Sequence, residues 1–228
     1  MSPKTSDKHV LPPRRDFIYN PPTDPLDILH EDEHLIVVNK PSDLLSVPGK
    51  TEPDCLEARL QDYNPKVLTI HRLDMATSGV MVFAKTAHAQ RHIGMQFEKR
   101  QTEKTYIARV AGHVENESGT IDLPLICDWP NRPRQMVCHE RGKPAQTAWE
   151  VLEREAAHTR LALYPKTGRS HQLRVHCLSL GHPILGDRFY ANDEILKAAN
   201  RLQLHAEALK LRHPDGGEWH TFTAECPF

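Results

Sequence analysis

The sequence lacks several features that would assign it to a membrane or extracellular class. It has no apolar run of the roughly 18–20 residues that a membrane-spanning helix needs. Residues 1–15 are polar and contain prolines, without the apolar stretch of a secretory signal. The five cysteines are odd in number and lack the spacing of a disulfide scaffold. We therefore expect a cytoplasmic protein with reduced thiols and no membrane partner.

Metal-site patterns are also missing, although the chain has 15 histidines. There is no Cys-x-x-Cys pair and no His-Glu-x-x-His motif. His171 and His176 lie five positions apart, which is a poor spacing for sharing one helix face. Cys127, Cys138 and His139 would meet only through accidents of folding. We expect no bound metal.

A basic excess, common in proteins that bind RNA, is absent as well. Lys and Arg number 29 against 30 Asp and Glu, which gives a formal net charge of −1. The charges are uneven, however: residues 85–109 contain six Lys or Arg and two acids. A second basic cluster comprises Arg132, Arg134, Arg141 and Lys143. A solvated helix face would explain either cluster equally well, so charge neither supports nor excludes an RNA partner.

The length of 228 residues fits one large domain with a sizeable core. Residues 1–25 are rich in proline and poor in bulky apolar residues, which predicts an extended or mobile arm. Residues 26–228 are predicted to form a single domain, with no separate RNA-binding domain before it.

Local patterns predict more strands than helices. Strands are predicted where β-branched and apolar residues gather, at 35–38, 79–84, 105–110, 119–125, 146–152, 159–164, 203–211 and 219–224. Helices are predicted at 54–63, from a Thr86 cap to about residue 100, and from Ser170 to Gly181. Short connections favour a mixed or mostly antiparallel sheet, so the predicted fold class is α+β.

The segment from His71 to Phe83 carries the clearest functional signal. It places Asp74 just after an imidazole and a guanidinium and just before an apolar, strand-like run. A polar loop that leads into a buried strand can hold a reactive side chain on a rigid support. The alternative, from these residues alone, is an ordinary turn in which Asp74 caps backbone N–H groups.

The order His-Arg-Leu-Asp at 71–74, with a small polar turn and Gly79 after it, closely resembles the nucleophile motif of the RluA family of pseudouridine synthases. Four further segments resemble family motifs, at 104–108 (KTYIA), 167–176 (TGRSHQLRVH), 181–187 (GHPILGD) and 204–206 (LHA). The similarity covers most of the chain from about residue 34 onward.

The resemblance implies a pseudouridine synthase catalytic domain over 26–228, with a curved, mostly antiparallel mixed sheet, flanking helices and a central cleft. It implies an isomerase that converts uridine to pseudouridine in structured RNA without a cofactor, and we expect a monomer. The insert at 122–133 and the segments 39–42 and 45–49 resemble family members that modify both 23S ribosomal RNA and the tRNA anticodon stem-loop. Those two RNAs are the predicted substrates.

The reaction breaks the uridine C1′–N1 bond, turns the uracil and joins C5 to C1′. By resemblance, Asp74 is the carboxylate that acts on the sugar, either by attack at C1′ or by removal of a C2′ proton. By the same resemblance, Arg174 is predicted to pair with this acid, and a neighbouring cation would keep a partly buried carboxylate ionised. Tyr106 matches the family's tyrosine, which implies that it stacks on the uracil and assists removal of the C5 proton.

Three further residues are predicted to handle the RNA. A base within a stem-loop must leave the stack before it can be modified. By resemblance, Arg72 fills the vacated position. His71 either stacks on a base or hydrogen-bonds within its own loop. Arg169 contacts a phosphate or has a structural role.

Other functions remain open from the sequence. The chain could belong to the family members that act on 23S ribosomal RNA alone. A non-catalytic RNA-binding assembly factor on the same scaffold would not need Asp74, Tyr106 and Arg174 together. A glycosidase or nucleoside hydrolase generally needs a second carboxylate, and the sequence gives none in a recognisable motif.

Overall fold

The computed structural model describes residue 12 and residues 18–228. The predicted arm over 1–25 therefore falls mostly outside the described residues. Within its described part, the Tyr19 hydroxyl donates a hydrogen bond to the Asp54 carbonyl oxygen (2.9 Å) and accepts one from the Leu45 N–H (3.1 Å). This end of the arm lies against the body of the protein.

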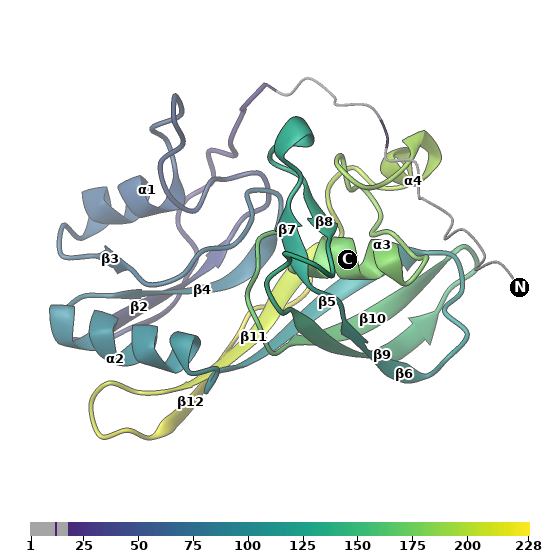
Figure 1. Ribbon diagram of the computed structural model, residues 1–228. Coiled ribbons are helices and arrows are strands. Elements are labelled where there is room, and N and C mark those ends of the chain that lie inside the picture. Colours follow the sequence, from purple (N-terminus) through teal and green to yellow (C-terminus); the bar gives the residue numbers. More distant parts are fainter. Residues whose placement is uncertain (1–11, 13–17) are drawn as a thin grey trace, which may run out of the picture.

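A ten-stranded sheet forms the centre of the molecule (Figure 1). Its main path has the order β1-β2-β4-β11-β5-β10-β9-β6, with β12 beside β11 and β3 beside β4. The strands are β1 Ile28–Glu31, β2 Leu35–Lys40, β3 Leu68–Thr69, β4 Ser78–Ala84, β5 Glu103–Ala111, β6 Ser118–Asp122, β9 Gln146–Arg154, β10 His158–Pro165, β11 Leu204–Arg212 and β12 Trp219–Thr223. Among the described strands, β4 and β11 pair in parallel and the other pairs are antiparallel. The predicted α+β fold with a mixed sheet is confirmed.

The parallel pairing of β4 with β11 depends on Gly79. Its φ is +113°, and a Cβ at this position would lie 2.2 Å from the Ala206 carbonyl oxygen. Glycine tolerates this angle and lets the two backbones approach so closely. Because β4 directly follows the Asp74 loop, the contact fixes where that loop enters the sheet.

The alternating side chains of β2 explain why this half of the sheet is covered on both faces. Ile36 packs in one cluster with helix α1 (Leu56–Tyr63), and its neighbour Leu35 packs in another with helix α2 (Ala87–Glu98). Successive side chains of a strand point to opposite faces. The two helices accordingly lie on opposite faces of the sheet (Figure 1).

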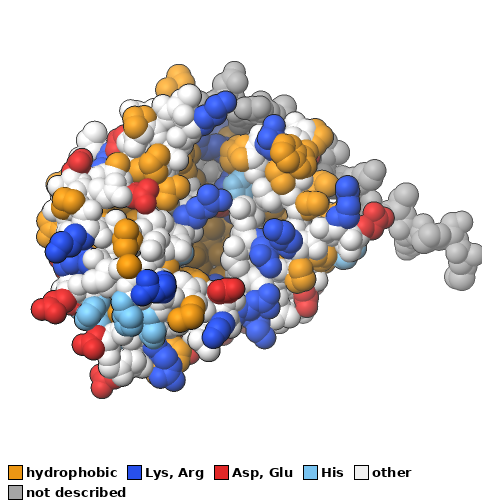
Figure 2. All heavy atoms as spheres, turned by 60° about the vertical axis from the view of Figure 1, so that its left-hand side comes forward, with side chains coloured by type: hydrophobic (Ala, Val, Ile, Leu, Met, Phe, Trp, Pro, Cys, Tyr) orange, Lys and Arg blue, Asp and Glu red, His pale blue; other side chains and the backbone are white. Residues whose placement is uncertain are grey.

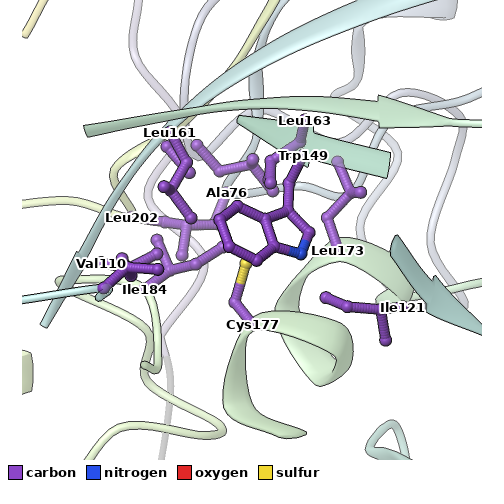
Figure 3. Close-up of a cluster of buried hydrophobic side chains, with 13 residues drawn as sticks. Ala76, Val110, Ile121, Trp149, Leu161, Leu163, Leu173, Cys177, Ile184 and Leu202 are labelled. Atoms are coloured by element: carbon purple, nitrogen blue, oxygen red, sulfur yellow. The ribbon is translucent and has the colours of Figure 1, made fainter. Parts of the chain in front are cut away.

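A third helix, α3 (Gln172–Ser179), covers the other half of the sheet. Its Leu173 and Cys177 pack in a cluster with Trp149 of β9 and with residues of β5 and β10 (Figure 3). Tyr106 of β5 packs against both this cluster and the α1 cluster. It therefore lies on the sheet between the two halves.

The strand predicted at 119–125 is wrong in its second half. Strand β6 ends at Asp122, and β7 (Leu125–Cys127) instead pairs with β8 (Gln135–Val137) in a separate two-stranded sheet. Pro124 lies between β6 and β7 and has no N–H for a sheet ladder. A 3-10 turn at Trp129–Asn131 lies in the connection between β7 and β8.

The third helix also differs from its prediction. It begins at Gln172 rather than at Ser170, because His171 has a left-handed φ of +52°. Its residues 172–177 are all buried, not only those of one apolar face. The short elements β1, β3 and α4 (Asp193–Lys197) were not predicted, since each is too brief to show a clear periodicity.

Among the described residues, no helix combines the length and the apolarity that spanning a bilayer demands.

Candidate active site

A cavity of about 490 Å³ lies where the loop before β4, strand β5, the end of α2 and the start of α3 meet. All six residues predicted for the site line it: His71, Arg72, Asp74, Tyr106, Arg169 and Arg174. The molecule is hollowed on the face shown in Figure 2, and Lys and Arg side chains surround the hollow. The fold therefore brings together residues that are as far apart in the sequence as His71 and Arg174.

Two serines hold the backbone of the Asp74 loop. Ser46 Oγ donates to the Leu73 carbonyl oxygen (2.7 Å) and accepts from the Leu73 N–H (3.1 Å). Ser42 Oγ donates to the Ala76 carbonyl oxygen (2.8 Å). The backbone is therefore fixed on both sides of Asp74, and the carboxylate projects from a rigid support.

A buried lysine completes this support. Lys40 is 0% exposed, and its Nζ donates to the carbonyl oxygens of Pro41 (2.8 Å), Leu44 (2.6 Å) and Met75 (2.9 Å). Burial lowers its pKa to about 7, while two nearby carboxylates oppose the shift. Three acceptors match the three hydrogens of an ammonium group. Lys40 therefore joins the end of β2 to the residue that follows Asp74.

We expect the substitution Lys40→Met to loosen this loop. It removes three hydrogen bonds and leaves buried carbonyl oxygens without donors, which costs about 1–3 kcal/mol for each unsatisfied group. The free energy of unfolding should fall by at least about 2 kcal/mol, and kcat should fall about tenfold or more because Asp74 is less well held. Urea unfolding and single-turnover kinetics measure both effects. Lys66→Met, at an exposed position, is the control, and a Lys40→Met variant with unchanged kcat would contradict the role.

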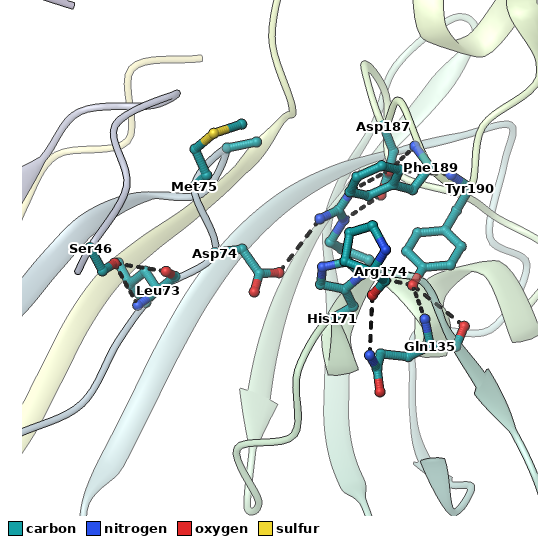
Figure 4. A network of polar contacts seen from close by, with 12 residues as sticks. Ser46, Leu73, Asp74, Met75, Gln135, His171, Arg174, Asp187, Phe189 and Tyr190 are labelled. Atoms are coloured by element: carbon teal, nitrogen blue, oxygen red, sulfur yellow. Dashed lines mark hydrogen bonds and ion pairs between the residues drawn. The ribbon is translucent and has the colours of Figure 1, made fainter. Parts of the chain in front are cut away.

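Arg174 is bound mainly to Asp187, not to Asp74. The guanidinium and the Asp187 carboxylate form a bidentate pair at 2.7 and 2.6 Å, with side chains only 3% and 1% exposed. The third nitrogen, Nη1, lies 3.6 Å from Asp74 Oδ2 (Figure 4). Burial would lower the pKa of Arg174, but Asp187 outweighs burial and raises it. Asp74 thus faces a permanent positive charge at ion-pair distance without being tied to it by a hydrogen bond.

Two aromatic rings flank this guanidinium. Its carbon Cζ lies 5.1 Å from the ring centroid of Phe189 and 5.3 Å from that of Tyr190. His171 stacks on Phe189, with ring centroids 5.5 Å apart, and its Nδ1 lies 2.8 Å from the Tyr190 hydroxyl. That hydroxyl also accepts a hydrogen bond from the Gln135 N–H of β8 (2.8 Å). The β7–β8 hairpin is therefore linked to the support of Arg174.

Tyr106 and Lys104 line the cavity from the same face of β5. Burial, and next the charge of Asp74, raise the pKa of Tyr106 well above its usual range, so the hydroxyl keeps its proton at neutral pH. Burial, and next Arg100, lower the pKa of Lys104 to about 8. Lys104 is therefore still mostly positive at neutral pH.

His71 makes its contacts inside the protein. Its Nε2 accepts a hydrogen bond from the Val82 N–H (3.1 Å), and its ring stacks on Phe97 with centroids 4.5 Å apart. Burial, and next Lys104, lower its pKa to about 3, so the ring is neutral at neutral pH. His71 was predicted either to stack on a base or to hydrogen-bond within its own loop. The structure shows a hydrogen-bond partner, Val82, but this residue lies on β4 and not in the loop.

The remaining two predicted residues differ in their surroundings. Arg72 is exposed at the cavity and makes no hydrogen bond or ion pair with the described residues. Arg169 Nε donates to the Pro144 carbonyl oxygen (3.1 Å). Its guanidinium thus has a contact within the protein while it also lines the cavity.

Four residues that support the site were not predicted from the sequence as site residues: Lys40, Ser42, Ser46 and Asp187. Two signals were available. Lys40 ends an apolar strand, although lysine is rarely buried without a partner. Asp187 closes the segment 181–187, which already resembled a family motif. As to metals, no group of three or more His, Cys, Asp or Glu side chains among the described residues could hold an ion.

Comparison with known proteins places this site in a family context. A family model described as RNA pseudouridylate synthase matches residues 34–179, a range that contains all six predicted site residues. The chain is 58% identical over 214 residues to the dual-specificity RNA pseudouridine synthase RluA of Salmonella typhimurium, covering 92% of this chain and 98% of that protein. It is 53% identical over 218 residues to the protein of the same name from Vibrio vulnificus, covering 92% and 87%.

Solved structures agree with the sequence comparison. Human RNA pseudouridylate synthase domain containing 1 superimposes with a TM-score of 0.79 at 28% identity, covering 92% of this chain and 87% of the human one. Human RNA pseudouridylate synthase domain containing 4 gives a TM-score of 0.71 at 25% identity, covering 88% of each chain. The similarity in three dimensions therefore extends over nearly all of the fold.

Proposed function

Because the chain belongs to the RNA pseudouridylate synthase family, whose members isomerise uridine to pseudouridine in RNA, we propose that Asp74 is the carboxylate that acts on the uridine sugar. The observation that supports this most directly is the position of Asp74. Its loop is fixed on both sides, and its carboxylate lies in the cavity beside Arg174. A carboxylate held in this way can capture positive charge at C1′ or remove a C2′ proton.

Tyr106 is proposed to hold the uracil while it is detached from the sugar. An aromatic ring offers a stacking surface to any base, and Tyr106 lines the same cavity as Asp74. Its raised pKa keeps the hydroxyl protonated. A protonated phenol can assist removal of the C5 proton only if it donates its own proton to another acceptor while its oxygen accepts the proton from C5.

Arg72 is proposed to fill the position that the extruded uridine leaves. It is exposed at the cavity, and a planar guanidinium can stack on the neighbouring bases. Arg72→Ala should lower kcat/KM on a stem-loop RNA by about tenfold, the loss of roughly one stacking contact. A substrate whose target uridine is already unstacked should lose less, because less energy is needed for extrusion. Equal losses on both substrates would contradict the role.

The proposed substrates are 23S ribosomal RNA and the tRNA anticodon stem-loop. Support comes from the resemblance of the 122–133 insert to dual-substrate family members, and from similarity to relatives named as dual-specificity enzymes. Pseudouridine mapping of total RNA from cells with and without the protein tests this, together with conversion of transcripts by the purified enzyme. Loss of sites in both RNAs is expected. Loss in 23S ribosomal RNA alone would favour the single-substrate alternative, and no loss with no conversion would favour an assembly factor.

The enzyme is proposed to act in the cytoplasm as a monomer. The six residues predicted for the site meet in one cavity of a single chain, which supports this proposal. Light scattering should give the mass of one chain at working concentrations, and a dimeric mass would contradict this.

A further inference from the structure

A second cavity lies on the other side of Asp74. It measures about 370 Å³ and lies next to the active cavity, because Asp74, His171 and Arg174 line both. Its other walls are largely apolar and include Leu45, Met75 and Phe189, while Glu52 and Arg188 are the charged residues there.

The two cavities differ in chemistry. The active cavity carries cations that suit the phosphate backbone of RNA, among them Arg72, Lys104 and Arg169. In the second cavity, Leu45, Met75 and Phe189 are each only partly buried. Figure 4 shows Met75 and Phe189 on the same, upper side of the Asp74 carboxylate. Partly exposed apolar side chains that surround a hollow mark a binding surface.

We propose that this second cavity receives the base of the nucleotide next to the target uridine. The inference rests on the proposed function and extends it to a second nucleobase subsite. Once the target sugar lies at Asp74, the adjoining nucleotide is one phosphodiester away, and the cavity that shares Asp74 is the nearest apolar space. A base has two apolar faces and binds well between Phe189 and a flexible methionine such as Met75.

The subsite also connects two peripheral segments to the substrate. Pro133, which precedes β8, lines one side of it, and Tyr19 at the described end of the arm lines another. A base in this cavity would thus contact the 122–133 hairpin region, whose sequence resembles that of dual-substrate family members. Recognition of the neighbouring base would depend on this region.

The test combines altered RNA with a filled cavity. Stem-loop substrates are made with an abasic residue on the 5′ or the 3′ side of the target uridine, and kcat/KM is measured under single-turnover conditions. For the wild-type enzyme, one of the two abasic RNAs should react about tenfold more slowly than intact RNA. Leu45→Trp, which places a larger side chain on the cavity wall at a residue with no proposed catalytic role, should lose about tenfold on intact RNA and nothing further on that abasic RNA.

Controls keep the result interpretable. Leu152→Trp adds the same side chain at an exposed position of β9, 49% exposed and outside both cavities, and should behave as wild type. If Leu45→Trp does not fold, Gly49→Leu fills the cavity from a second position on its wall.

Several outcomes would overturn the inference. One is that neither abasic RNA reacts more slowly with wild-type enzyme. Another is that the Leu45→Trp loss and the abasic loss in kcat/KM multiply when the variant acts on the abasic RNA. A third is that deletion of residues 1–17 accelerates intact and abasic RNAs equally, which would mean that the arm occupies the cavity. Failure of wild-type enzyme to convert intact RNA would instead refute the proposed function, and the subsite with it.

Discussion

Asp74→Asn is expected to abolish pseudouridine formation, with kcat reduced by more than about a thousandfold. The substitution removes the negative charge that is proposed to act on the sugar and keeps the shape of the side chain, so the loss should fall on the transition state. The fold should be nearly unaffected. The turn at Asp74 is closed by a backbone hydrogen bond, in which the Thr77 N–H donates to the Asp74 carbonyl oxygen (3.0 Å). Its carboxylate is not the main partner of Arg174.

Three measurements separate this result from misfolding. Pseudouridine content of a stem-loop RNA should stay at background, the free energy of unfolding should change by less than about 1 kcal/mol, and affinity for the RNA should remain within a few-fold of wild type. Asp62→Asn, at an exposed position of α1, is the matched control and should remain active. Substantial turnover by Asp74→Asn would show that another group carries out the chemistry.

Arg174→Met is expected to be the most destabilising single change in the site. It leaves Asp187 buried without its cation, which typically costs about 3–5 kcal/mol. Activity should fall by about a hundredfold or more as well, since Asp74 loses the positive charge 3.6 Å away. The double variant Arg174→Met/Asp187→Leu should be more stable than Arg174→Met alone, because Asp187 no longer leaves an unpaired buried charge. The double variant should not recover activity.

The destabilisation should depend on pH in a defined direction. Burial would raise the pKa of Asp187, but the guanidinium and its hydrogen bonds outweigh burial and hold the pKa below its usual range. In the wild type, this pair therefore stabilises the fold above the unfolded pKa of about 4 and loses its contribution as the pH falls through the folded pKa.

In Arg174→Met the sign reverses. Burial now raises the pKa of Asp187 above its unfolded value, so that protonation favours the folded state. The difference in unfolding free energy between wild type and variant should be largest at pH 7 and should shrink toward pH 4. Urea unfolding at several pH values measures it, and a pH-independent difference would contradict the argument.

The parts of the site that the sequence could predict are the ones that carry motifs. Asp74, Tyr106 and Arg174 lie in segments whose residue order is distinctive, and the structure brings them to one cavity. Lys40, Ser42 and Ser46 lie in the segments 39–42 and 45–49, which also resemble family members, but their supporting role could not be predicted, because they bind carbonyl oxygens, which every residue has. Which carbonyl oxygens they bind depends on tertiary contact.

The same contrast applies to the fold. Long strands such as β5 and β10 and the capped helix α2 were predicted, since their periodicity and the Thr86 cap are local features. The pairing of β7 with β8 and the left-handed His171 depend on contacts beyond the local segment. The aromatic contacts of His171 with Phe189 and Tyr190 exist only after α3 has packed.

The position of β11 sets the order in which the enzyme can become active during its synthesis. This strand lies between β4, which supports the Asp74 loop, and β5, which carries Tyr106. Until residues 204–212 leave the ribosome, those two strands have no common neighbour to hold them in register. Such long-range pairing makes folding slow and places it late. An unfinished chain would therefore expose no assembled site to the ribosomal and transfer RNAs that surround it.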